Sequence, residues 1–129
     1  TNVLSVTLDL PFDTAVSQVR DILAKHGFGI ITEIDVTGTL KSKLDVDFKN
    51  YAILGACNPE LAHNAIDTDD RMGLLLPCNV IVYENGEGIN VETLKPTRML
   101  SFFEDSQTHE VAKRAETDLE KAFRELRKL

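Results

Sequence analysis

The segment Tyr51-Ala52-Ile53-Leu54-Gly55-Ala56-Cys57-Asn58-Pro59 decides the fold, together with Leu74-Leu75-Leu76-Pro77-Cys78-Asn79-Val80-Ile81-Val82-Tyr83. Each segment contains an apolar run typical of a buried strand, and each has a cysteine followed by an asparagine where the strand meets a turn. If the two strands are antiparallel neighbours, the segments meet at one edge of a sheet and bring the two thiols together. The sequence gives no other indication of a chemical site.

The rest of the chain divides into further strands and helices by its apolar periodicity. We expect strands at 3–8, 28–36, 51–57, 79–84 and 89–94. Asn85-Gly86-Glu87-Gly88 separates the last two of these strands and is typical of a hairpin turn. Residues 98–103 are apolar and indicate either a short strand or a helical turn.

Helices are expected where an N-cap residue precedes an amphipathic stretch. Asp13 is the expected cap of a helix at 14–25, and Thr108 the expected cap of a long helix reaching about residue 128. A short helix over 37–44 would be capped by Thr37 or Thr39. Asn58 is the expected cap of a short helix at 59–66, with Pro59 at its first position because proline lacks the amide that would be unpaired there. The order predicts an α+β fold: an antiparallel sheet of about five strands, two long helices on one face, and short helices between strands.

Length, composition and charge limit the classes of protein. The 129 residues fit one domain, 1–129, with 43% hydrophobic and 27% charged residues. The net charge of −7 argues against nucleic-acid and anionic-membrane partners, which need clustered Lys and Arg. No apolar run approaches the ~20 residues of a membrane span. With no secretory signal at the N-terminus and only two cysteines, the expected location is the cytoplasm.

The two cysteine segments resemble the prokaryotic domain-of-unknown-function family 302, and so do Gly27-Phe28 with the strand after them and Lys95-Pro96 through Met99. The resemblance covers nearly the whole chain. It implies a TATA-binding-protein-like α+β fold, often assembled as dimers, and it implies no agreed biochemical activity. The expected partner is therefore a second copy of the chain in a homodimer. DNA binding does not follow, because function belongs to sites and not to folds.

The strand ends at Cys57, Asn58, Cys78 and Asn79 form the candidate ligand-binding site. The two asparagines would add amide donors and acceptors beside the thiols, and the following helix would contribute free backbone amides. Such a pocket would hold a small polar or anionic molecule. The alternative is that both cysteines are buried apolar fillers and both asparagines are cap or turn residues.

Thiol chemistry is the second functional hypothesis. Cys57 directly precedes a helix, which can stabilise a thiolate, and Cys78 could be its resolving partner, although the pair lacks Cys-x-x-Cys spacing. Cys57, Cys78 and His63 are weak candidates for metal ligands, because a structural zinc site usually has four ligands in close pairs. No cofactor, metal or catalytic residue is predicted. The sequence therefore favours a non-catalytic small-ligand or effector-binding module over a thiol-based redox or metal-handling protein.

Two features indicate where a homodimer contact would lie. Met99, Leu100, Phe102 and Phe103 form an apolar cluster that belongs either to the core or to such a contact. The strand at 89–94 could also be an exposed edge that pairs with a partner.

Overall fold

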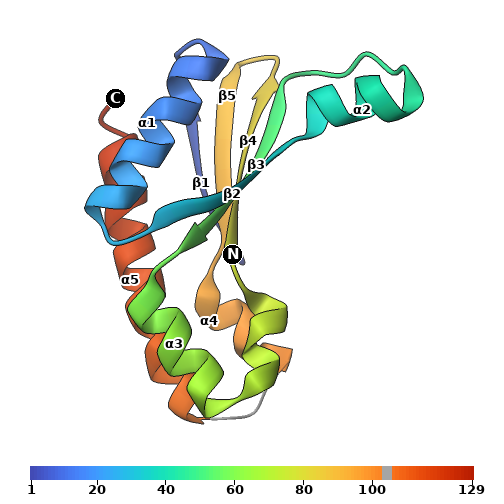
Figure 1. Cartoon of the computed structure of the whole chain (residues 1–129). Coiled ribbons are helices and arrows are strands. Elements are labelled where there is room, and N and C mark those ends of the chain that lie inside the picture. Colours follow the sequence, from blue (N-terminus) through green and yellow to red (C-terminus); the bar gives the residue numbers. More distant parts are fainter. Residues whose placement is uncertain (103–105) are drawn as a thin grey trace.

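A computed structural model describes residues 1–102 and 106–129 of the chain. Its elements follow the order shown in Figure 1. They are β1 (Val3–Leu8), α1 (Phe12–Lys25), β2 (Gly29–Asp35), α2 (Val36–Leu44), β3 (Tyr51–Cys57), α3 (Pro59–Thr68), the 3-10 helix η1 (Asp70–Leu75), β4 (Cys78–Asn85), β5 (Gly88–Leu94), α4 (Pro96–Met99), the 3-10 helix η2 (Leu100–Phe102) and α5 (Ser106–Leu126). Among the described residues, no helix is both long enough and apolar enough to cross a membrane.

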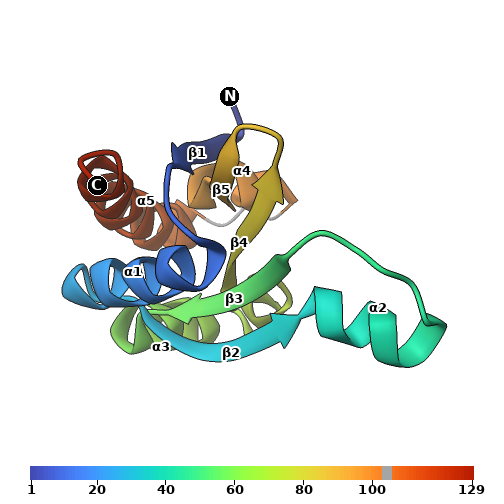
Figure 2. The same cartoon turned by 90° about the horizontal axis from the view of Figure 1, so that it is seen from above.

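The five strands form one antiparallel sheet in the order β1-β5-β4-β3-β2. Helices α1 and α5 cover one face of it, and α3 and α4 lie at one end (Figures 1 and 2). Strands β1, β4 and β5 alternate between buried and more exposed side chains, as in β1, where Leu4, Val6 and Leu8 point into the core. Strand β2, at the edge, has no buried residue. The predicted α+β fold and its helical layer are confirmed.

The core lies between the sheet and the two long helices. Its largest fully buried side chains are Phe28, Phe123, Leu23, Leu54, Leu119 and Leu126. Burying one such side chain contributes about 1.5–3 kcal/mol, so this layer dominates stability. A smaller cluster of Ala65, Met72, Leu100 and Ala112 holds the end of the molecule at α3 and α5.

Three predicted helix caps are wrong for identifiable reasons. Helix α1 begins after Pro11, so Asp13 lies within its first turn and is not the cap. A carboxylate at this position interacts favourably with the positive end of the helix dipole. Asp35 caps α2, with Oδ1 accepting from the Gly38 amide at 3.0 Å. Thr37 instead donates to the Lys49 carbonyl and accepts from the Tyr51 amide. Thr108 lies inside α5 and is 1% exposed.

The expected exposed edge at 89–94 is also wrong. Strand β5 lies between β1 and β4, so β1 and β2 are the edges of the sheet. The stretch 98–103 is helical up to Phe102, and Leu100 is buried in the smaller cluster. Phe103 lies outside the described residues, and only the backbone of Phe102 is described.

Candidate functional site

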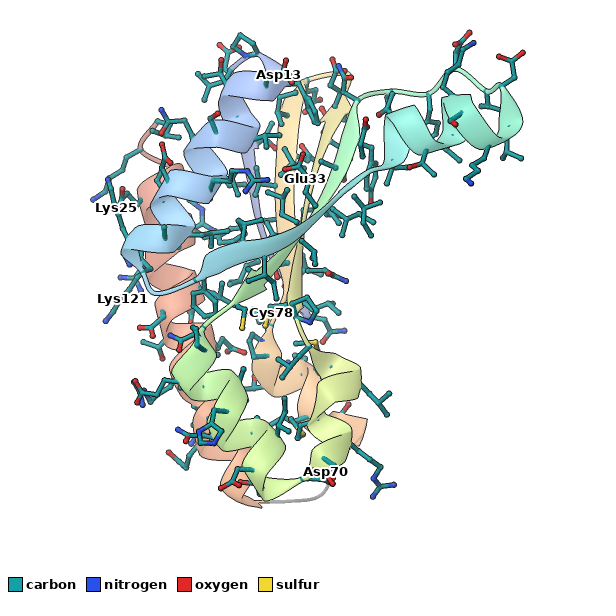
Figure 3. The ribbon with its side chains drawn as sticks, viewed as in Figure 1. Asp13, Lys25, Glu33, Asp70, Cys78 and Lys121 are labelled. Atoms are coloured by element: carbon teal, nitrogen blue, oxygen red, sulfur yellow. The ribbon has the colours of Figure 1, made fainter. Side chains whose placement is uncertain are left out.

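The two cysteine segments meet as predicted. Strands β3 and β4 are antiparallel neighbours, with Ala56 opposite Cys78 and Gly55 opposite Asn79. Both segments therefore reach the same end of the sheet, beside α3 and α4. Figure 3 shows Cys78 at this end, between the sheet and the small helices.

The two thiols are nevertheless not near each other, which corrects the expectation of a cysteine pair. Cys78 faces Ala56, whereas Cys57 faces Gly29 of β2 on the other side of β3. Since successive side chains of a strand point to opposite faces, this register separates the thiols. Both cysteines are free.

The environment of Cys78 disfavours thiol chemistry. Its side chain is buried, and that burial raises the pKa of the thiol to about 11. Because the thiolate is the nucleophile and the metal ligand, Cys78 at neutral pH is an inert, small apolar residue. Cys57 is half-buried at the last position of β3. No observation in the described chain favours the redox hypothesis.

Asn58 occupies the cap position that the sequence predicts. Its Oδ1 accepts a hydrogen bond from the Leu61 amide at 3.2 Å, and Pro59 takes the first helical position of α3. The cap fixes the start of α3 directly after Cys57. The asparagine side chain is thus a structural element of the site as well as part of its wall.

The side chain of Asn79 lies on the opposite face of the sheet from that of Cys78, its neighbour in the chain. Its side chain is exposed, on the uncovered face of the sheet. There it lines a hollow of about 510 Å³ together with Cys78, Leu74, Pro77 and Leu94, among others. Its backbone carbonyl accepts from Thr93 Oγ1 at 2.8 Å, which is a contact within the sheet.

A cavity of about 60 Å³ lies on the other side, between the sheet end and helices α3 and α5. Cys57, Asn58 and Cys78 contribute to its wall. The remaining wall is mostly apolar and comes from Phe28, Leu61, Ala65, Met72, Leu76, Met99, Val111, Ala112 and Ala115, among others. The sequence analysis did not identify these residues. The sequence feature that could have indicated this cavity is the pair of alanines on each of α3 and α5, Ala62 and Ala65 and Ala112 and Ala115. Their small side chains leave space where the two helices meet the sheet.

His63 does not join this site. It is exposed on α3, whose buried residues are Leu61 and Ala65. Among the described residues, no group of three or more His, Cys, Asp or Glu side chains is arranged to hold a metal ion. Cys57, Cys78 and His63 therefore do not form a metal site.

Comparison with known proteins identifies the family. The family model described as "Domain of unknown function DUF302" matches residues 4–126. The chain belongs to the DUF302 family. The crystal structure of an uncharacterized conserved DUF302 protein from Bacillus stearothermophilus is similar to it, with a TM-score of 0.88 and 25% sequence identity over 96% of this chain and 97% of that one. No curated protein matches the chain. The DUF302 match runs from β1 to α5, so it includes every residue of the cavity wall.

Proposed function

We propose that this DUF302 chain is a non-catalytic binding module that takes a small molecule, apolar end first, into the cavity beside Cys57 and Cys78. The observation that carries the proposal is the cavity itself, which lies where the two cysteine segments meet α3 and α5. Ligand sites are typically concave, mostly apolar and equipped with a few polar groups. Here Asn58 is one of the few polar groups in the wall.

The size and lining of the cavity support a short aliphatic group as the ligand. One water-sized group needs about 10–15 Å³ of such space, so about 60 Å³ accommodates roughly four to six groups of this size. Water gains little from this cavity, because a buried water needs two to four polar partners. Each methylene group that enters would contribute about 0.8 kcal/mol. The apolar lining favours a hydrocarbon end over the polar ligand expected from the sequence, whose polar or anionic group would then remain near Asn58.

The proposal is tested by NMR titration of the ¹⁵N-labelled protein with butan-1-ol and with butanoate. We expect saturable amide shifts confined to α3, α5 and the ends of β3 and β4. Shifts with butan-1-ol alone identify a neutral apolar ligand, and shifts with both identify a site that accepts an anionic end. Linear shifts without saturation, or shifts elsewhere in the protein, would contradict the proposal.

A variant whose side chain fills the cavity tests whether the ligand binds there. Ala65 is buried in the wall, so Ala65→Leu adds three carbon atoms to this space. Ala24→Leu adds the same atoms on the exposed side of α1 and is the control. We expect Ala65→Leu to abolish the saturable shifts and Ala24→Leu to leave them unchanged. Equal binding by both variants would place the ligand outside the cavity.

A further inference from the structure

The hollow that Asn79 lines on the uncovered face of the sheet has the size of a small-molecule site. We call it the open-face hollow. Its volume of about 510 Å³ lies within the range of about 300–1,000 Å³ that is typical of ligand pockets. Its lining comes from β1, β4 and β5 of the sheet and from η1 and α4 beside them. Ile81 and Glu92 point to this face, because the strand residues on either side of each are buried on the other.

The walls of the open-face hollow are mostly apolar and accessible to water. Leu74 of η1 is 78% exposed, and Leu94 of β5 is 50% exposed. Val3, Ile81 and Met99 contribute further apolar wall between and beside them. Apolar residues gathered on one exposed surface typically mark a place where a ligand or a partner binds. These side chains would pack against the hydrocarbon part of a ligand.

One charged side chain lies among these apolar residues. Of the described residues that line the hollow, Glu92 is the only Asp, Glu, Lys, Arg or His. Its Oε2 accepts a hydrogen bond from Ser5 Oγ at 3.2 Å, and its Oε1 accepts one from the Tyr83 hydroxyl at 2.8 Å. Both donors are neutral, and none of the salt bridges between described residues includes Glu92. Neither bonded neighbour therefore balances its negative charge.

The two hydrogen bonds orient the Glu92 carboxylate and leave part of it free to bind. An ionised carboxylate has about four lone-pair sites, and the two hydroxyl donors occupy two of them. Tyr83 is held in turn, because its hydroxyl accepts from Asn90 Nδ2 at 3.1 Å and its ring stacks on Tyr51 with centroids 5.3 Å apart. A donor that enters the hollow thus meets a carboxylate that is already in position, which reduces the entropy lost on binding.

This combination favours an organic cation over a metal ion. Calcium takes about six to eight oxygen ligands and magnesium a nearly octahedral set. The described lining offers one carboxylate, one amide side chain, that of Asn79, and otherwise mainly apolar groups. A single carboxylate is enough for a charge-assisted hydrogen bond to an ammonium group. The net charge of −7 also attracts a cation to the protein.

We propose that the open-face hollow is a second binding site, which takes a primary alkylammonium ligand. The ammonium group bonds to Glu92, and the alkyl chain lies against Leu74 and Leu94. This site is independent of the proposed function, although Leu76 and Cys78, among others, line both the hollow and the cavity. Glu92 and Leu94 line only the hollow, and Ala65 lines only the cavity, so chemical shifts distinguish a ligand in one from a ligand in the other.

The test is an NMR titration of the ¹⁵N-labelled protein with hexylammonium, hexan-1-ol and hexanoate at low salt. We expect saturable amide shifts in β4 and β5 around Glu92 with hexylammonium. Hexan-1-ol should bind there about tenfold more weakly or worse, because it forms no charge-assisted bond, and hexanoate should not bind there. Butylammonium should bind more weakly than hexylammonium, by up to about fourfold for each methylene group removed.

Two outcomes of this titration would overturn the proposal. Equal binding of hexan-1-ol and hexylammonium at the open-face hollow would show that the charge of Glu92 has no part in recognition. Hexylammonium shifts confined to α3 and α5 would place the ligand in the cavity, and they would leave the proposed function intact. Conversely, shifts around Glu92 without any binding of butan-1-ol in the cavity would support this site alone.

Glu92→Gln removes the charge and keeps the shape and one oxygen acceptor of the side chain. We expect it to weaken hexylammonium binding about tenfold or more. Glu84→Gln is the matched control, because Glu84 is also a half-buried glutamate of β4, lies outside the hollow and changes the net charge equally. Unchanged binding in Glu92→Gln, or an equal loss in both variants, would contradict a bond to Glu92.

Leu94→Asn tests the apolar wall separately from the charge. Leu94 is half exposed, so folding should be retained, which circular dichroism verifies for every variant. We expect weaker binding of hexylammonium and a smaller difference between hexylammonium and butylammonium, because less apolar surface remains for the longer chain. An unchanged difference between the two amines would show that the alkyl chain does not lie against Leu94, and would overturn the proposed mode of binding even if Glu92→Gln failed to fold.

Discussion

Asn58 lies directly over Gly27, so closely that a Cβ atom on Gly27 would be 2.9 Å from Asn58 Nδ2. Gly27 has a φ of +89° and turns the chain from the end of α1 into β2. The residue that caps α3 and contributes to the cavity wall is thus packed against the turn after α1. The contact links the glycine that ends α1 to the asparagine that caps α3, so a substitution at either residue should affect the other.

Gly27→Ala should destabilise the protein. A side chain at this φ is strained, and the added methyl group would push against Asn58. We expect the free energy of unfolding to fall by about 1–2 kcal/mol. Urea denaturation measures it, with Gly29→Ala as control, because a Cβ atom at Gly29 meets nothing within 4 Å. Equal losses in the two variants would show that neither the backbone conformation nor Asn58 matters at this turn.

Asn58→Ala should cost about 1 kcal/mol, because the Leu61 amide loses its side-chain acceptor. Asn58→Ser keeps an acceptor at the cap and should recover most of this loss. The same substitution to alanine also removes the group that crowds Gly27. In the double variant Gly27→Ala/Asn58→Ala, the combined loss should therefore be smaller than the sum of the two single losses. Strictly additive losses would contradict the contact.

Much of the fold is predictable from local sequence because its signals act over a few residues. Asn58-Pro59 gave the start of α3 correctly, and the alternation in 3–8 gave β1, since cap chemistry and strand periodicity are local. Asp13, Thr37 and Thr108 failed as caps because several polar residues near each helix start compete, and tertiary contacts select among them. Thr37, for example, is held by Lys49 and Tyr51 of the returning chain.

The site was predictable only in part. The meeting of the two cysteine segments follows from strand pairing, but the separation of the thiols depends on register. A shift of one residue moves a side chain to the other face of the sheet, and no local signal in either segment sets that shift. The cavity depends on Ala65 and Ala112 from helices far apart in sequence, whose approach is a property of the packed fold.

Gly55→Ala should also destabilise the protein. A Cβ atom at Gly55 would collide with the Thr32 hydroxyl and lie 2.8 Å from Pro77 Cγ. We expect a loss of about 1–3 kcal/mol, as for other overpacked sites, measured by thermal or urea denaturation. Gly73→Ala is the control, because nothing lies within 4 Å of its Cβ position and alanine favours helical backbone. A loss in Gly73→Ala as large as in Gly55→Ala would contradict this account.

Cys78 should make the stability of the protein fall in alkaline solution. Burial raises the pKa of its thiol from 9.0 to about 11, so between these values the folded protein retains a proton that the unfolded chain releases. The associated stability is fully present below pH 9 and is lost as the pH rises through 11. Each unit of pKa difference corresponds to about 1.4 kcal/mol, so the full loss is on the order of 3 kcal/mol.

Other groups titrate in the same range, so the measurement is a difference between variants. The free energy of unfolding is determined by urea denaturation from pH 8 to 11 in a reducing buffer for the wild type, Cys78→Ala and Cys57→Ala. Cys78→Ala should be less stable at pH 8, because it leaves a small gap in the core. The advantage of the wild type over Cys78→Ala should shrink as the pH rises. Cys57→Ala keeps the burial of Cys78, the larger cause of its raised pKa, and loses only the smaller contribution of the Cys57 charge, so most of the pH dependence should remain. A constant difference between the wild type and Cys78→Ala across this range would show that the Cys78 thiol titrates alike in the folded and unfolded chain.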